Sequence, residues 1–170
     1  MSPSTPPPDP GHSGIGVLFV CLGNICRSPA AEGCFLHLLE RERLQAAFHV
    51  DSAGTGGWHV GKPADPRMRE AASRRGLLLP SRARQIEPAD LDRFAHILTM
   101  DKDNLAAVRQ LARGRGIKAR IEPITGYCRH HRVEEVPDPY YGGAEGFEHV
   151  LDILEDACEG FLDSLKPLRS

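Results

Sequence analysis

The sequence is poor in the features that mark nucleic-acid-binding, membrane-spanning and exported proteins. Its formal net charge is only -2 over 170 residues, so an anion-binding site would have to be built locally from a few groups. No apolar run approaches the length of a membrane span. Residues 1–13 lack the basic start and apolar centre of a signal peptide, and their proline- and serine-rich composition predicts a disordered tail.

Cysteine is scarce and forms no paired motif. The five cysteines are Cys21, Cys26, Cys34, Cys128 and Cys158. An odd number in a chain without an export signal predicts reduced thiols and a cytoplasmic location, not a disulfide framework. A metal site is disfavoured, because Cys21 and Cys26 have no second pair at zinc-ligand spacing. The segment "GYCRHH" offers Cys128, His130 and His131 as further ligands, but an exposed polar loop explains it better.

What the chain does contain is the pattern of one α/β domain. Hydrophobic residues make up 41% and charged residues 26% of the sequence, as in soluble globular proteins, and residues 14–170 are expected to form a single domain. Four apolar runs, at 16–21, 48–54, 95–100 and 117–124, indicate strands. They alternate with helical patterns, which predicts an open four-stranded parallel sheet with helices on both faces.

Four helical patterns accompany these strands. The first is expected to begin with Pro29 at its first position. The second should run from an N-cap at Asp65 to a stop at Gly76. Apolar residues recur at helical spacing in the third, which ends near Gly114, and most clearly in the last, over 147–165.

The segment "VCLGNICRSPAAEG", residues 20–33, follows the first strand and leads into the first helix. Ligands of open parallel sheets bind outside the carboxyl ends of the strands, which is where Cys21 stands. A loop that enters a helix N-terminus can point backbone N–H groups at an oxyanion, and Gly23 and Asn24 tolerate the positive φ that such a loop needs. Arg27 can bind two phosphate oxygens with its planar guanidinium.

The same surroundings favour the thiolate form of a cysteine, because both the helix N-terminus and Arg27 stabilise negative charge. Ser28 could donate its hydroxyl to the sulfur. One loop would then supply a phosphate cradle and a nucleophile for attack of sulfur on phosphorus. Cys21 taken alone is more simply a buried core cysteine at a strand end. The combination with glycine, asparagine, arginine, serine and proline favours the cradle.

Residues 17–32, "VLFVCLGNICRSPAAE", resemble the signature of the low-molecular-weight protein tyrosine phosphatases. The segments "DSAGTGGWHVGKPADPR", "ARQI", "LTMDKDNL" and "DPYYGG" resemble the family in the same order, so the similarity runs from about Gly16 to the C-terminus. The resemblance implies a phosphotyrosine-hydrolysing enzyme with a phosphate-binding loop at the end of the first strand. It also implies no metal and no organic cofactor.

The resemblance implies roles for individual residues. Cys21 would be the nucleophile, Arg27 the phosphate clamp, and Asp138 the general acid that later acts as a base, although an aspartate before proline is by itself more typical of a turn. The residues that bind phosphate or support the loop would be Leu22, Gly23, Asn24, Ile25, Cys26, Ser28 and Ser52. The substrate slot would be formed by Trp58, Tyr140 and Tyr141. Asp101 matches an acidic position of the supporting network, and Ser81 departs from the histidine of many relatives.

Other functions stay open at this point. A protein arginine phosphatase shares the loop, but Ile25 stands where those proteins commonly have threonine. A redox-sensing phosphopeptide-binding module is a second alternative. Cys26 lies in the same tight loop as Cys21 and could reach oxidised Cys21 after modest backbone movement, or it could be a small packed residue under the loop. The expected partners are phosphotyrosine-containing proteins, with an autophosphorylating tyrosine kinase as one candidate, and neither nucleic acid nor membrane.

Overall fold

The computed structural model describes residues 14–140 and 142–165, so the proposed tail at 1–13 and Tyr141 lie outside the described residues. Four strands occur in this part of the chain: β1 (Ile15–Cys21), β2 (Phe48–Gly54), β3 (His96–Thr99) and β4 (Arg120–Pro123). The α-helices of this part are α1 (Arg27–Arg41), α2 (Pro66–Ser73), α3 (Asp90–Arg93), α4 (Lys102–Ala112) and α5 (Ala144–Leu165). Two short 3-10 helices, Gln45–Ala47 and Ile124–Tyr127, complete them.

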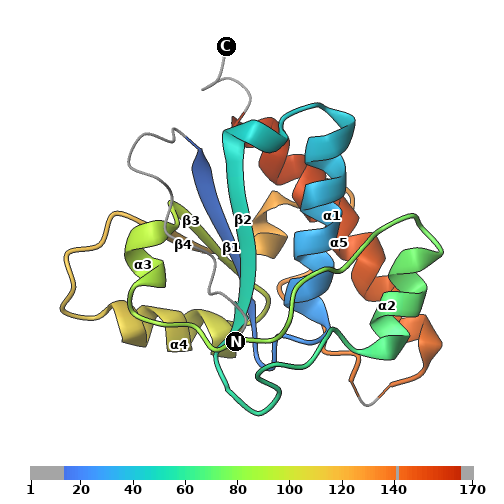
Figure 1. Ribbon diagram of the computed structural model, residues 1–170, viewed down its shortest axis with the longest axis horizontal. Helices are drawn as coiled ribbons and strands as arrows, with labels where there is room; N and C mark the ends of the chain where they lie inside the picture. Colours follow the sequence, from blue (N-terminus) through green and yellow to red (C-terminus); the bar gives the residue numbers. More distant parts are fainter. Residues whose placement is uncertain (1–13, 141, 166–170) are drawn as a thin grey trace.

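The strands form one parallel sheet in the order β2-β1-β3-β4. From β1 the chain passes through α1 to β2 on one side, and from β2 it passes through α2 and α3 to β3 on the other side of β1 (Figure 1). The strand order therefore reverses its direction of growth at β1. The predicted fold class, an open four-stranded parallel sheet with helices on both faces, is confirmed.

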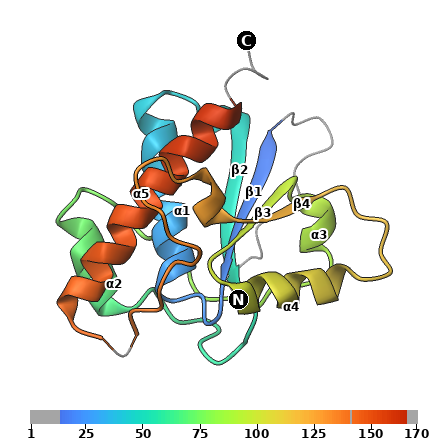
Figure 2. The ribbon, with the colours of Figure 1, turned by 180° about the vertical axis from the view of Figure 1, so that it is seen from behind.

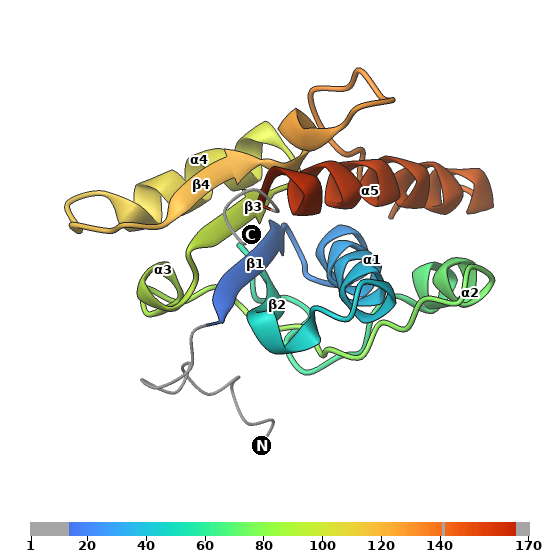
Figure 3. The ribbon, with the colours of Figure 1, turned by 90° about the horizontal axis from the view of Figure 1, so that it is seen from above.

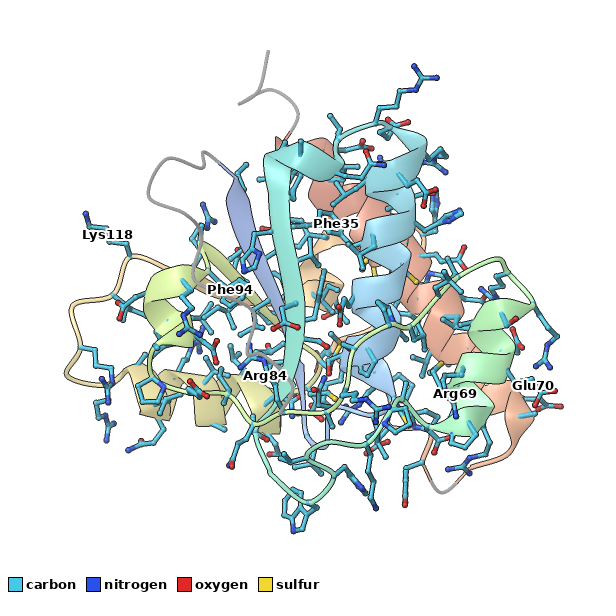
Figure 4. The ribbon with its side chains drawn as sticks, viewed as in Figure 1. Phe35, Arg69, Glu70, Arg84, Phe94 and Lys118 are labelled. Atoms are coloured by element: carbon cyan, nitrogen blue, oxygen red, sulfur yellow. The ribbon has the colours of Figure 1, made fainter. Side chains whose placement is uncertain are left out.

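The two faces of the sheet carry separate hydrophobic cores. Side chains of β1 alternate between them: Val17 and Phe19 join the core under α1 and α5, whereas Leu18 and Val20 join the smaller core that contains Phe94. Seen from above, α1, α2 and α5 lie on one side of the strands and α3 and α4 on the other (Figure 3). Figure 4 shows Phe35 of α1 and Phe94 on opposite sides of the sheet.

Helix α5 closes the larger core. It packs along α1, and its N-terminal half reaches α2 (Figure 2). Its apolar face is buried from Phe147 to Leu165, as the helical spacing predicts. Arg75, which follows α2, forms ion pairs with three residues of α5 and stabilises the packing of α2 against α5; the three are Glu148, Asp152 and Glu155.

Element boundaries differ from the sequence-based expectations at several ends. Helix α1 begins at Arg27, so Pro29 is its third residue and not its first. Proline fits there because the first four N–H groups of a helix have no partner within the helix. Helix α2 has Asp65 as its N-cap, as expected, but ends at Ser73, and Gly76 with φ of +76° belongs to the turn that follows. The four-residue helix α3 is too short for the periodicity of the sequence to indicate it.

In the residues that the structure describes, no helix is both long and apolar enough to cross a bilayer. All five cysteines are free.

Candidate active site

The loop between β1 and α1 lies at the carboxyl edge of the sheet, at the lower side of the view in Figure 1. Its backbone is held by the segments that follow β2. Thr55 and Gly56 donate backbone hydrogen bonds to the carbonyls of Cys21 and Leu22, and Asp65 donates to the carbonyl of Ile25. These three hydrogen bonds tie the loop to the segments that follow β2.

Asn24 has the special backbone conformation of this loop, with φ of +58°. Gly23 was expected to share a positive φ, and it does not. Its lack of a side chain has another reason, because a Cβ at Gly23 would lie 3.0 Å from Cδ2 of His59. Asparagine is one of the few residues other than glycine that enter the left-handed region at low cost.

The sulfur of Cys21 is buried and receives polar contacts. The backbone N–H of Asn24 donates to Sγ at 3.2 Å, and the hydroxyl of Ser28 lies 3.0 Å from it. Asn24 Nδ2 donates to Ser28 Oγ at 2.8 Å, so the hydroxyl proton of Ser28 can point either at the sulfur or at the carbonyl of Ala53, 3.4 Å away. When Ser28 donates to the sulfur, it and the N–H of Asn24 both stabilise negative charge on Cys21.

A buried polar network supports Asn24 from behind. Its Nδ2 also donates to Ser52 Oγ at 3.0 Å, while the backbone N–H of Arg84 donates to Asn24 Oδ1 at 2.9 Å and fixes the orientation of the amide. The hydroxyls of Ser52 and Ser81 both donate to Glu32 Oε1, at 2.6 and 2.8 Å. Ser81, which departs from the expected family pattern, thus has a hydrogen bond within this network.

Glu32 is the buried carboxyl of this network, and sequence reasoning missed it. Burial raises the pKa of Glu32 to about 7, although the hydrogen bonds from Ser52 and Ser81 oppose the change. The one available signal was its place as a single charged residue among small and apolar residues at the start of α1.

Arg27 reaches from the first turn of α1 toward the other loops of the site. Its side chain is buried, and Nη1 donates to Asp101 Oδ2 at 2.7 Å and to the carbonyl of Val136 at 3.1 Å. Asp101 also caps α4 through a capping box with Asn104, so its own position is fixed. These contacts hold the guanidinium at one edge of the cavity.

Asp138 lies on the segment that precedes α5. Its Oδ2 is 3.6 Å from Nη2 of Arg27. Its side chain is 44% exposed. The backbone N–H of Tyr140 donates to Asp138 Oδ1 at 3.1 Å. The carboxyl of Asp138 therefore stands at the mouth of the site, opposite the buried sulfur.

These groups line one cavity of about 410 Å³. Most of the site residues predicted from the sequence line this cavity, and His59, which the sequence analysis did not select, lines it too. The lining residues are Cys21, Leu22, Gly23, Ile25, Cys26, Arg27, Trp58, His59, Asp138 and Tyr140. Asn24, Ser28 and Ser52 lie behind this wall as supports. Tyr141 lies outside the described residues.

The rim of the cavity is apolar and exposed. Trp58 is 70% and Leu22 44% exposed, and the ring of Trp58 covers Gly56, where a Cβ would collide with it. Tyr140 faces His59 with ring centroids 6.1 Å apart. Exposed aromatic and aliphatic side chains around a polar floor suit a ligand that joins an aryl ring to an anion.

Cys26, the second cysteine of the loop, does not belong to a group of described residues that could bind a metal ion. Burial raises the pKa of the Cys26 thiol, with a smaller contribution from the charge of Asp65. Among the residues that the structure describes, no three or more His, Cys, Asp or Glu side chains gather in a way that could hold a metal ion.

Known proteins share both the sequence and this architecture. The family model described as low molecular weight phosphotyrosine protein phosphatase matches residues 16–169. The low molecular weight protein-tyrosine-phosphatase YfkJ of Bacillus subtilis is 41% identical over 155 residues, covering 89% of this chain and 96% of that protein.

Two crystal structures add to this. The protein tyrosine phosphatase of Entamoeba histolytica with Hepes in its active site superposes with a TM-score of 0.87 at 39% identity, over 92% of this chain and all of that one. The drosophila arginine phosphatase superposes with a TM-score of 0.84 at 33% identity, over 88% of this chain and 97% of that one. With a model match over nearly its whole length and relatives above 30% identity, the chain belongs to the low molecular weight phosphotyrosine protein phosphatase family.

Proposed function

We propose that this protein hydrolyses phosphotyrosine in proteins through a cysteinyl-phosphate intermediate, and that residues 14–170 form the single phosphatase domain. The observation that supports this most directly is the convergence of Cys21, Arg27 and Asp138 on one cavity. A nucleophile, an anion clamp and a proton donor are the three groups that the reaction needs.

In the first half-reaction, Cys21 Sγ attacks phosphorus as the thiolate. The sulfur–phosphorus bond forms while the bond from phosphorus to the tyrosyl oxygen breaks. Asp138, in its protonated form, gives its proton to the departing phenolate. Ser28 and the N–H of Asn24 stabilise the thiolate before the attack.

In the second half-reaction, Asp138 is a carboxylate and accepts a proton from water. The water oxygen attacks phosphorus, the sulfur–phosphorus bond breaks, and inorganic phosphate leaves with Cys21 again as the thiolate. Arg27 binds two equatorial oxygens in both transition states, together with backbone N–H groups of the loop. Asn24, Ser52 and Ser28 keep the loop in its binding shape.

The proposed substrate slot selects by depth. Trp58 and Tyr140 stand at the rim and Cys21 at the floor, so an aryl ring between the walls would bring its phosphate to the sulfur. We assign Tyr141 to the same slot from the sequence. A phosphoserine side chain is shorter and would leave its phosphate above the floor.

Hydrolysis of phosphoarginine is the alternative, since the chain also resembles the drosophila arginine phosphatase. Ile25 argues for phosphotyrosine, because its side chain lies on the cavity wall and supplies methyl groups where a hydroxyl could bind a guanidinium. A redox-sensing phosphopeptide-binding module without turnover is less consistent with the site, since such a module does not need Asp138.

The deciding experiment compares matched phosphotyrosine and phosphoarginine peptides, with Cys21→Ser as the control enzyme. We expect the ratio of kcat/KM values to favour phosphotyrosine. Cys21→Ser should lose turnover of both peptides and keep vanadate binding, because the cradle is backbone and Arg27. Preference for the phosphoarginine peptide would establish the alternative. Turnover near wild type in Cys21→Ser would remove Cys21 as the nucleophile.

We further propose that Cys26 protects the site from oxidation. Peroxide would convert Cys21 to a sulfenic acid, and the Cys26 thiol would displace water from it to form a disulfide, which a dithiol reductant reverses. Burial raises the pKa of the Cys26 thiol, which lowers its thiolate fraction and slows this capture. We place the protein in the cytoplasm, where its five free cysteines would stay reduced, and name an autophosphorylating tyrosine kinase as one candidate substrate.

A further inference from the structure

The general acid proposed above lies on a segment whose two ends are held differently. At the N-terminal end, the N–H of Val136 donates to the carbonyl of Met100 at 2.8 Å, and the carbonyl of Val136 accepts from Arg27. Asp138 itself is exposed and has the ion pair with Arg27 and the N–H of Tyr140 as its polar contacts. Through the N–H of Tyr140, the position of Asp138 depends in part on what holds Tyr140.

Arg67 contacts Tyr140 from helix α2. Its guanidinium carbon lies 5.5 Å from the centroid of the Tyr140 ring and 4.8 Å from the centroid of Phe147, the buried aromatic in the first turn of α5. Both distances are within the range of a cation–π interaction. One cation thus joins the segment of the acid to the helix that follows it.

The guanidinium is itself fixed from the opposite side. Arg67 Nε and Nη2 donate to the two carboxylate oxygens of Asp65, at 3.1 and 2.9 Å. Asp65 is buried and caps α2, and its N–H donates to the carbonyl of Ile25 in the cradle. Burial alone would raise the pKa of Asp65, but the hydrogen bonds from Arg67 outweigh it and lower this pKa, so the pair is ionised.

We infer that Arg67 is a positioning residue for the general acid: through Asp65, Arg67 and Tyr140 it ties Asp138 to the phosphate cradle. The inference rests on the proposed role of Asp138. Arg67 touches neither the sulfur nor the phosphate position, so its loss should weaken proton donation and leave anion binding in place.

The readout is the dependence of the rate on the leaving group. Phenyl phosphate needs a proton on its departing oxygen, whereas p-nitrophenyl phosphate needs little, and kcat/KM reports the step that expels this group. The measured quantity is the ratio of kcat/KM for p-nitrophenyl phosphate to that for phenyl phosphate. Because both substrates meet the same active enzyme, the ratio does not change when part of a variant is unfolded.

Arg67→Met keeps the aliphatic stem and removes the cation. We expect the ratio to rise by about 2- to 5-fold, the factor that one cation–π contact at a half-exposed site contributes to an equilibrium. Arg67→Lys retains a positive charge beside Asp65 and Tyr140, so its ratio should rise less than that of Arg67→Met. The inhibition constant of inorganic phosphate should stay within about 2-fold of wild type in both variants, because Arg67 lies outside the cradle and the hydrogen bond from Asp65 to the carbonyl of Ile25 is made by the backbone.

Two comparison variants separate the possible failures. Arg74→Met removes a cation of the same region that pairs with Glu148 of α5, and it should leave the ratio unchanged. Asp138→Asn should raise the ratio by roughly 10²-fold or more, which is the usual contribution of a general acid. An unchanged ratio in Asp138→Asn would overturn the proposed acid and the inference with it. A raised ratio in Asp138→Asn with an unchanged one in Arg67→Met would overturn the inference alone, and the packing of buried Pro139 would then suffice to hold the segment.

Discussion

Replacing Glu32 by glutamine should change how the stability of the protein depends on pH. Glu32 is buried in α1, and its pKa is raised from 4.5 to about 7 in the folded chain. The folded state therefore holds this proton more tightly than the unfolded state. Stability from this group is fully present below about pH 4.5 and is lost as the pH rises through about 7.

The size of the effect follows from the two pKa values. The difference of about 2.5 units corresponds to about 3 kcal/mol when the carboxyl is fully ionised, and about 2.5 kcal/mol of this falls between about pH 5 and pH 8. Glutamine keeps an oxygen that accepts hydrogen bonds from Ser52 and Ser81, and it stays neutral. Glu32→Gln should thus remove this part of the pH dependence while preserving the network.

The assay is urea unfolding of the full chain at about pH 5, 6, 7 and 8. The free energy of unfolding of wild type should fall toward pH 8 by about 2.5 kcal/mol more than that of Glu32→Gln. Glu40→Gln is the matched control, since it removes an exposed carboxylate from the same helix, and it should follow wild type. Parallel curves for wild type and Glu32→Gln would refute the reasoning, because the carboxyl would then ionise equally easily in the folded and unfolded chains.

Three further predictions concern the site and its surroundings. Arg27→Lys should lower kcat and weaken phosphate inhibition, because an ammonium cannot make two parallel bonds to a phosphoryl group; steady-state kinetics equal to wild type would leave Arg27 as a structural residue. Cys26→Ala should keep activity but recover less of it with dithiothreitol after peroxide treatment, and equal recovery would limit Cys26 to packing. Asp156→Asn should lower the free energy of unfolding by about 1–3 kcal/mol at pH 7, since Asp156 accepts the N–H groups of residues 129–131; no change in urea unfolding would contradict this.

Local chemistry explains why the cradle could be predicted from the sequence. The apolar run before Cys21 marks the end of a buried strand, and Asn24 and Arg27 follow at the spacing of a loop that turns into a helix N-terminus. Each of these signals lies within a few residues of the next. The parallel direction of the strands follows from the alternation of strand and helix, whereas their order was not predicted from the sequence. The roles of Trp58 and Asp138 came from the family resemblance, because their own sequence contexts are typical of loops and turns.

The parts that the sequence did not predict are contacts between distant segments. Glu32 meets Ser52 and Ser81 only after α1, β2 and the segment before α3 have packed together. Arg67 contacts Tyr140 only because α2 lies against the start of α5. A single sequence carries no periodicity that links such positions. The start of α1 at Arg27 was not predicted for a different reason. Proline is compatible with any position of the first turn of a helix, so Pro29 does not show where α1 begins.

The change at β1 in the side on which strands are added to the sheet has a consequence for how this protein can evolve. The cavity lies at the carboxyl edge of the sheet, where α1 after β1 and α4 after β3 leave toward opposite faces. It is formed by this arrangement of the chain and does not require a gap in either hydrophobic core. Leu22, Trp58 and His59 line its rim without belonging to either hydrophobic core. We expect substitutions at these positions to alter which phosphoprotein is accepted at little cost to folding. Substrate preference in this scaffold can therefore diverge while thermal stability stays nearly constant.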